Sequence, residues 1–228
     1  MQRHFVQELE ALKTNIIRMG SLAEQAAHDS IKAILEQNGE LARDVIAKEH
    51  RINEFELEND EAVVDLLALQ QPVASDLRFI LSALKINNDL ERIGDHAVNI
   101  AESAIRYADR PKLAVQLELP RMAQIAETML REAIDGFIHG NPALGREVLR
   151  NDDVIDDLNR QTVRDLVQVI RTDPEAVEQA LELVRVSRNL ERIADLATNI
   201  AEEIIYFAEA HVVKHHFEEK TKSPPDRG

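Results

Sequence analysis

A stretch of thirteen residues that occurs twice constrains the fold of this chain more than any other feature. LERIGDHAVNIAE at 90–102 returns as LERIADLATNIAE at 190–202, and ten of the thirteen paired positions are identical. The two copies lie 100 residues apart in a chain of 228 residues. Internal repetition at this distance indicates two similar halves that each build the same small unit.

The pattern of apolar residues around the two copies is that of helices. Apolar side chains recur every three or four residues, and no segment alternates between apolar and polar residues as a strand does. The expected helices span 5–37, 40–70, 75–109, 121–138, a segment from the turn at 139–142 to 171, and 173–210. The sequence therefore predicts an all-α protein with two tandem antiparallel three-helix bundles, 1–110 and 118–210, followed by a polar C-terminal tail at 211–228.

The charge balance argues against some classes of function. The formal net charge of −15 opposes binding to nucleic acid, so we expect no nucleic-acid partner. The chain contains no cysteine, which removes disulfides and thiolate metal ligands. The first residues lack the apolar core of a signal peptide, and no apolar run is long enough to cross a bilayer. We therefore expect a cytoplasmic protein.

Both copies of the repeated stretch place a row of side-chain oxygens on one face of a helix. Glu91, Asp95, Asn99 and Glu102 fall within about 80° of one another on a helix, and the residues 100 positions later do the same. Apolar residues on the opposite side place the row mostly outside the bundle core. Such a row is commonly a solvated surface. Its unchanged recurrence, amide included, and its near lack of basic residues one turn away favour a binding site.

A second acidic pattern lies on the preceding helix of each half. At an offset of 103 residues, 43–56 matches 146–159, and we expect these side chains to face the first row across a groove. The aligned residues with side-chain oxygens are Glu49, Asn53 and Glu56 in the first half and Asp152, Asp156 and Asn159 in the second. Oxygen ligands of this kind suit hard or borderline cations such as Mg²⁺, Ca²⁺, Mn²⁺ or iron. Because one helix offers few ligands, ions bridged between two helices fit best.

Other chemistry has less support in the sequence. Ferritin-like di-iron oxidases need Glu-x-x-His pairs, and none of the histidines has a glutamate three residues before it. His211, His215 and His216 are close enough along the chain to bind a divalent metal, although a polar tail is the explanation we favour. The chain has no glycine-rich phosphate loop and no nucleophile elbow, so we expect no enzymatic activity.

Three segments together resemble the PhoU family of bacterial phosphate-uptake regulators. They are PVASDLRFILSALKINNDLERIGDHAVNIAE at 72–102, its partial echo at 180–202, and AEAHVVKHH at 208–216. The resemblance implies two three-helix bundles and a cytoplasmic, non-enzymatic protein that is often a homodimer. It also implies partners: the ATPase subunit of the phosphate ABC transporter and the phosphate sensor histidine kinase, whose response the protein represses when phosphate is plentiful.

The resemblance also implies a repeated Glu/Asp-x-x-x-Asp motif that binds metal, such as multinuclear iron clusters or Mn, Mg, Zn or Ca ions. Matched position by position, the expected ligands are Glu49, Asn53, Glu91, Asp95, Asp152, Asp156, Glu191 and Asp195. Asn53 stands where the family pattern has an aspartate, so we expect weaker metal loading in the first bundle. An alternative function is that of a metal-buffering or storage protein with carboxylate clusters on its surface.

Overall fold

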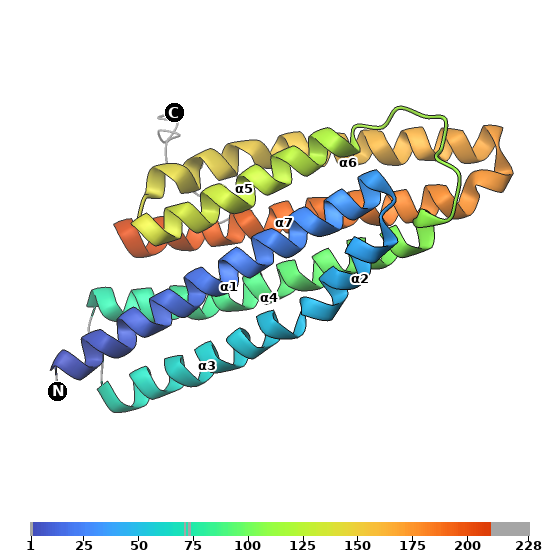
Figure 1. Cartoon of the computed structure of the whole chain (residues 1–228). Coiled ribbons are helices and arrows are strands. Elements are labelled where there is room, and N and C mark those ends of the chain that lie inside the picture. Colours follow the sequence, from blue (N-terminus) through green and yellow to red (C-terminus); the bar gives the residue numbers. More distant parts are fainter. Residues whose placement is uncertain (1, 71, 73, 211–228) are drawn as a thin grey trace, which may run out of the picture.

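Two antiparallel three-helix bundles lie side by side in the protein (Figure 1). The computed structural model describes residues 2–70, 72 and 74–210, and these contain no strand. The helices of the first bundle are α1 (Gln2–Glu36), α2 (Gly39–Lys48), α3 (His50–Gln70) and α4 (Ala74–Ala108). Those of the second are α5 (Leu119–His139), α6 (Pro142–Thr172), the 3₁₀ turn η1 (Pro174–Ala176) and α7 (Val177–Glu209).

This architecture confirms the predicted fold class of two tandem three-helix bundles. The predicted polar tail at 211–228, with its three histidines, lies outside the described residues. The domain boundaries at 110 and 118 stay a prediction, because one continuous hydrophobic core runs through both halves.

The expected continuous helix over 40–70 is wrong, because the chain breaks at Glu49 between α2 and α3. The backbone N–H groups of Ile52 and Asn53 both bond to the oxygen of Glu49, at 2.9 and 3.4 Å. One residue on, the ring Nδ1 of His50 lies 2.9 Å from the backbone oxygen of Ala47. In an unbroken helix, the Ala47 oxygen would accept from the backbone N–H four residues later. The ring of His50 therefore competes with the backbone for this acceptor. The corresponding helix of the second bundle, α6, runs unbroken.

Polar residues and left-handed backbone positions define the helix ends. Gln37, directly after α1, takes the left-handed position, with φ of 54°. Its side chain donates to the backbone oxygens of Tyr107 and Arg110 at 3.2 and 2.8 Å, which ties the end of α1 to the end of α4. Asn38 instead caps α2 by accepting from the N–H of Leu41.

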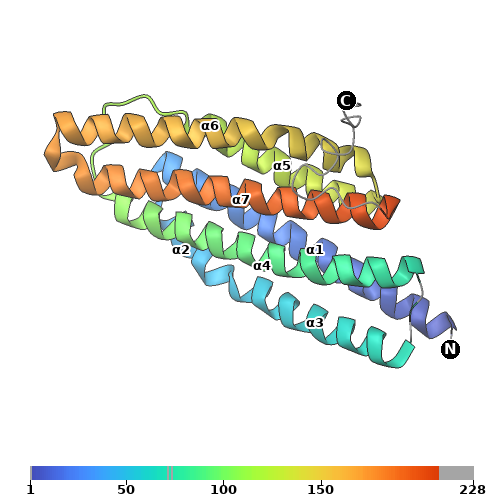
Figure 2. The ribbon, with the colours of Figure 1, turned by 180° about the vertical axis from the view of Figure 1, so that it is seen from behind.

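The helices α4 and α7, which carry the repeated stretch, pack against each other in opposite directions (Figure 2). Three contacts fix this register, because residue numbers rise along α4 as they fall along α7. The contacts are Lys85–Glu203 at 2.8 Å, His96–Asn189 at 2.8 Å and Arg106–Glu182 at 3.0 Å. The two copies of the repeat therefore meet at the centre of the molecule.

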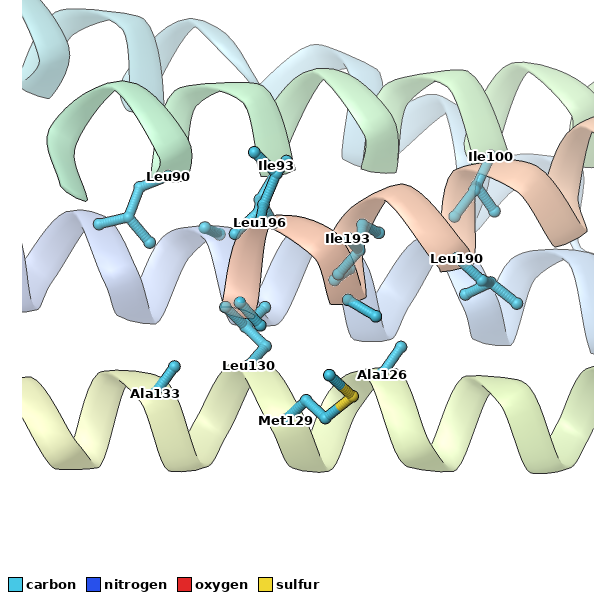
Figure 3. Packing of buried hydrophobic residues seen from close by; sticks show 14 of the residues in the cluster. Leu90, Ile93, Ile100, Ala126, Met129, Leu130, Ala133, Leu190, Ile193 and Leu196 are labelled. Atoms are coloured by element: carbon cyan, nitrogen blue, oxygen red, sulfur yellow. The ribbon is translucent and has the colours of Figure 1, made fainter. Parts of the chain in front are cut away.

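Apolar side chains of both repeats fill that centre together with α5. Figure 3 shows them pointing into a common layer: Leu90, Ile93 and Ile100 from α4, Leu190, Ile193 and Leu196 from α7, and Met129 and Leu130 from α5. All of these side chains are almost completely buried. The apolar stripe predicted for each repeated helix thus forms the contact between the bundles as well as the core within each bundle.

Close approach of α6 to α7 depends on Gly145. A Cβ atom at this position would lie 2.9 Å from the backbone oxygen of Ala201, which cannot move aside. We expect Gly145→Ala to lower the free energy of unfolding by about 1–3 kcal/mol, despite the better helix propensity of alanine. Urea unfolding measures the change. The control is Gly20→Ala, whose Cβ would meet only side-chain atoms of Ile134, at 3.4 Å. It should be neutral or slightly stabilising, and equal destabilisation by both variants would contradict the packing argument.

Candidate metal-binding faces

In the first bundle, side-chain oxygens from α3, from α4 and from the residue at the break between α2 and α3 gather together. We call this group face 1: Glu49, Asn53, Glu56, Glu91 and Asp95. Burial raises the pKa of the Glu91 carboxyl, and the negative charges of Asp95, Glu56 and Glu49 raise it further. Asn53 Nδ2 donates to Glu49 Oε1 at 2.8 Å. The structure therefore brings together the four predicted residues of this half and adds Glu56.

In the second bundle, the equivalent residues on α6 and α7 form face 2: Asp152, Asp156, Glu191 and Asp195. Burial and the charges of Asp195 and Asp156 raise the pKa of the Glu191 carboxyl. Burial also raises the pKa of Asp195, with a further contribution from Asp156 and an opposing one from Arg192. Three of the four predicted residues thus lie close together. Asp152 is half-buried one turn before Asp156 on α6.

Basic residues compensate face 2, which contradicts the expectation that the acidic row lacks them. Arg192 Nη1 lies 2.9 Å from Asp195 Oδ2, and Arg160 Nη1 lies 3.5 Å from Asp156 Oδ2. In the first half the equivalent arginine, Arg92, lies 3.9 Å from Asp89 instead. The difference follows from one substitution in the repeat. The second half has Asn189 where the first has Asp89, so no carboxylate one turn back attracts Arg192.

Glu56 is the residue of face 1 that the alignment of the two halves points to and the family motif does not include. The alignment of the second helices contained the signal, because Asn53 and Glu56 in the first half match Asp156 and Asn159 in the second. The amide comes first and the acid second in the first half, and the order is reversed in the second half. Each face therefore carries four carboxylates. Asn159 accepts a hydrogen bond from Ser187 Oγ at 2.7 Å. The loss of charge at Asn53 is therefore balanced by Glu56, so face 1 has as many carboxylates as face 2.

The donor chemistry of both faces fits a hard cation, since every ligand atom is a carboxylate or amide oxygen. Within the described residues, however, no group of three or more Asp, Glu or His side chains is arranged so that it could hold a metal ion. The carboxylates would have to rotate before they could share a cation. Mutual repulsion keeps like charges apart until a cation neutralises them.

Comparison with known proteins identifies the family. The sequence profile of the PhoU domain matches residues 16–104 and 119–204, one match in each bundle. The chain belongs to the PhoU family. A PhoU homologue of Aquifex aeolicus, described as a phosphate-specific transport system accessory protein, is 39% identical over 214 residues, which cover 93% of this chain and 97% of the relative. A homologue of the same description from Clostridium acetobutylicum is 34% identical, over 89% of this chain and 93% of the relative.

Solved structures of PhoU proteins share the fold. The crystal structure of PhoU from Pseudomonas aeruginosa superposes with a TM-score of 0.88 at 35% identity, and covers 91% of this chain and 100% of that one. The structure of the phosphate transport system regulatory protein PhoU from Streptococcus pneumoniae gives a TM-score of 0.85 at 26% identity, over 92% of this chain and 99% of that one. Among the described helices, none is both long and apolar enough to cross a bilayer.

The raised pKa of Glu91 predicts how stability depends on pH. A carboxyl whose pKa is higher in the folded state is protonated more readily there, so its ionisation destabilises the fold as pH rises above the ordinary value of 4.5. We expect Glu91→Gln, in the presence of a chelator, to raise the free energy of unfolding at pH 7 by a few tenths of a kcal/mol, because solvent screens a half-exposed group. The gain should vanish below pH 4.5, where the wild-type carboxyl is protonated in both states.

Urea unfolding at neutral and acidic pH tests this. Glu54→Gln, on the exposed side of α3, serves as the control and should change stability little at either pH. A destabilising effect of Glu91→Gln at pH 7 in chelator would show that repulsion does not dominate face 1.

Proposed function

We propose that this chain is a non-enzymatic, cytoplasmic regulator of phosphate uptake and phosphate-starvation signalling. It links the ATPase subunit of the phosphate ABC transporter to the phosphate sensor histidine kinase and represses the response when phosphate is plentiful. The observation that carries the proposal is the match to the PhoU domain in both bundles, together with relatives described as phosphate-specific transport system accessory proteins. An accessory protein acts through other proteins, which supports a docking role and not a chemical one. We expect it to work as a homodimer.

We propose further that faces 1 and 2 bind metal ions, such as multinuclear iron clusters or Mn, Mg, Zn or Ca ions. The like charges around Glu91 and Glu191 support this, because a cation would relieve their repulsion. A bound cation supplies positive charge that joins two helices through their carboxylates. In the first bundle Glu49, Asn53, Glu56, Glu91 and Asp95 would hold it. In the second the ligands would be Asp152, Asp156, Glu191 and Asp195.

The competing function is metal buffering or storage by the same carboxylates. The two functions differ in what the acidic faces are for. In a regulator, metal supports the shape of a docking protein, so partner binding survives the loss of one face in measurable form. In a buffering protein, metal binding is itself the activity, and no transporter or kinase subunit is bound.

A pull-down distinguishes them. We expect the purified chain to retain the transporter ATPase subunit and the cytoplasmic part of the sensor kinase from the same organism. The variant Glu191→Ala/Asp195→Ala should still retain them at a reduced but measurable level. An unrelated ABC-transporter ATPase is the specificity control. Failure of the wild-type chain to retain either partner, with and without added Mn²⁺, would contradict the regulator and favour the buffering protein.

Metal loading should differ between the two faces. We expect Mn²⁺ to raise the melting temperature of the wild-type chain, since a cation bound only by the folded state stabilises it by about 2.7 kcal/mol at one hundred times its Kd. Glu91→Gln/Asp95→Asn should remove more of this increase than Glu191→Gln/Asp195→Asn, because Arg192 and Arg160 already neutralise part of face 2. Thermal unfolding with and without chelator measures it. A larger loss from the face 2 pair would overturn this order, and no increase in the wild type would overturn the metal proposal.

A further inference from the structure

The two ends of the contact between α4 and α7 carry different kinds of side chain. At the end formed by the start of α4 and the last turn of α7, three phenylalanine rings pack together with centroids 5.7 to 6.1 Å apart. These rings belong to Phe79, Phe137 and Phe207. Because the halves repeat at an offset of 100 residues, Gln179 and Tyr107 occupy the positions of Phe79 and Phe207 at the opposite end. The duplicated contact is therefore aromatic at one end and polar at the other.

A pocket of about 530 Å³ opens at the polar end. Its lining residues come from the last turn of α4, the start of the connection to α5 and the first turns of α7. Figure 1 shows the chain leaving the end of α4 toward α5. The polar lining of the pocket consists of Arg106 from α4, Asp109 and Arg110 just after α4, and Glu178, Gln179, Glu182 and Arg185 from α7. This volume is in the range of pockets that hold small organic molecules.

Gln179 lines the pocket with a side-chain amide that makes no hydrogen bond to the other described residues. The residue is only 8% exposed. Its amide atoms still touch the solvent of the pocket, because they are not among the fully buried, unpartnered polar atoms of the described residues. The amide of Gln179 is thus available to a molecule that enters the pocket.

Three arginines line the pocket together with this amide. Arg106 Nε lies 3.0 Å and Arg185 Nη1 lies 2.6 Å from the same atom, Oε1 of Glu182, and Arg110 pairs with Glu178. Proteins use guanidinium groups that converge in this way to hold an oxyanion. Here the carboxylate of Glu182 occupies the position that an oxyanion would take. Arg110 and Arg185 are about half exposed, and ion pairs at such exposure are weak. An incoming anion can therefore compete for their donors.

We propose that this pocket binds a small organic anion. Its phosphate or carboxylate group pairs with Arg110 and Arg185, and its polar remainder accepts from or donates to the amide of Gln179. The pocket lies about three helical turns beyond Asp95 along α4, away from face 1. The inference uses only the local side chains, so it holds or fails independently of the proposed function.

Isothermal titration of the full chain with ATP, citrate and inorganic phosphate tests the proposal, on protein stripped of metal and dialysed free of chelator so that neither the acidic faces nor the chelator contribute. ATP and citrate separate phosphate from carboxylate recognition, and inorganic phosphate tests whether the oxyanion alone is enough. We expect millimolar or tighter binding of ATP or citrate. Arg185→Gln should weaken it about tenfold or more, as expected for loss of a charged hydrogen bond. Gln179→Phe, which copies Phe79, should abolish it by filling the pocket.

The matched control is Arg150→Gln. Arg150 is exposed on α6 and pairs with Glu147 three residues earlier, as Arg185 pairs with Glu182. This variant should bind like the wild type. Circular dichroism confirms that each variant is folded, and Arg185→Gln carries the test if Gln179→Phe is not. Absence of binding to both organic anions, or binding that Arg185→Gln leaves unchanged, would overturn the proposal.

Discussion

The antiparallel contact between α4 and α7 is the interaction on which the rest of the structure depends. Each helix carries a copy of the repeat, and the apolar side of each copy faces the other, so one contact both joins the bundles and buries the repeat. Lys85–Glu203 and Arg106–Glu182 set the register from opposite ends of the contact. Because the apolar sides of α4 and α7 face the core, the rows of side-chain oxygens on the same helices lie toward the neighbouring helix and the solvent.

Much of this was predictable because it depends on spacing along the chain. The repeat predicts two equal halves, and the period of apolar residues predicts the helices and the side of each that is buried. The break at Glu49 was not predictable, because it depends on the ring of His50 competing for one backbone oxygen. The eight predicted site residues make up the two faces together with Glu56, which the alignment of the two halves points to and the family motif does not include.

The two halves also show how a repeat can keep its motif and change its electrostatics. The residues of the motif are the same, but one neighbour, Asp89 in one half and Asn189 in the other, determines where the following arginine pairs. Asn189 in turn contacts His96 of the other bundle at 2.8 Å. The direction of Arg192 is therefore set by a residue outside its own motif, and composition alone gives no sign of it.

The break at Glu49 gives the first bundle a local backbone feature that the second lacks. A helix is stiff because each turn is bonded to the next, and that ladder is interrupted between α2 and α3. Asp152 and Asp156 instead stand on the unbroken α6. The acidic residues that precede the repeat are therefore mounted at a joint between two helices in the first half and along one continuous helix in the second.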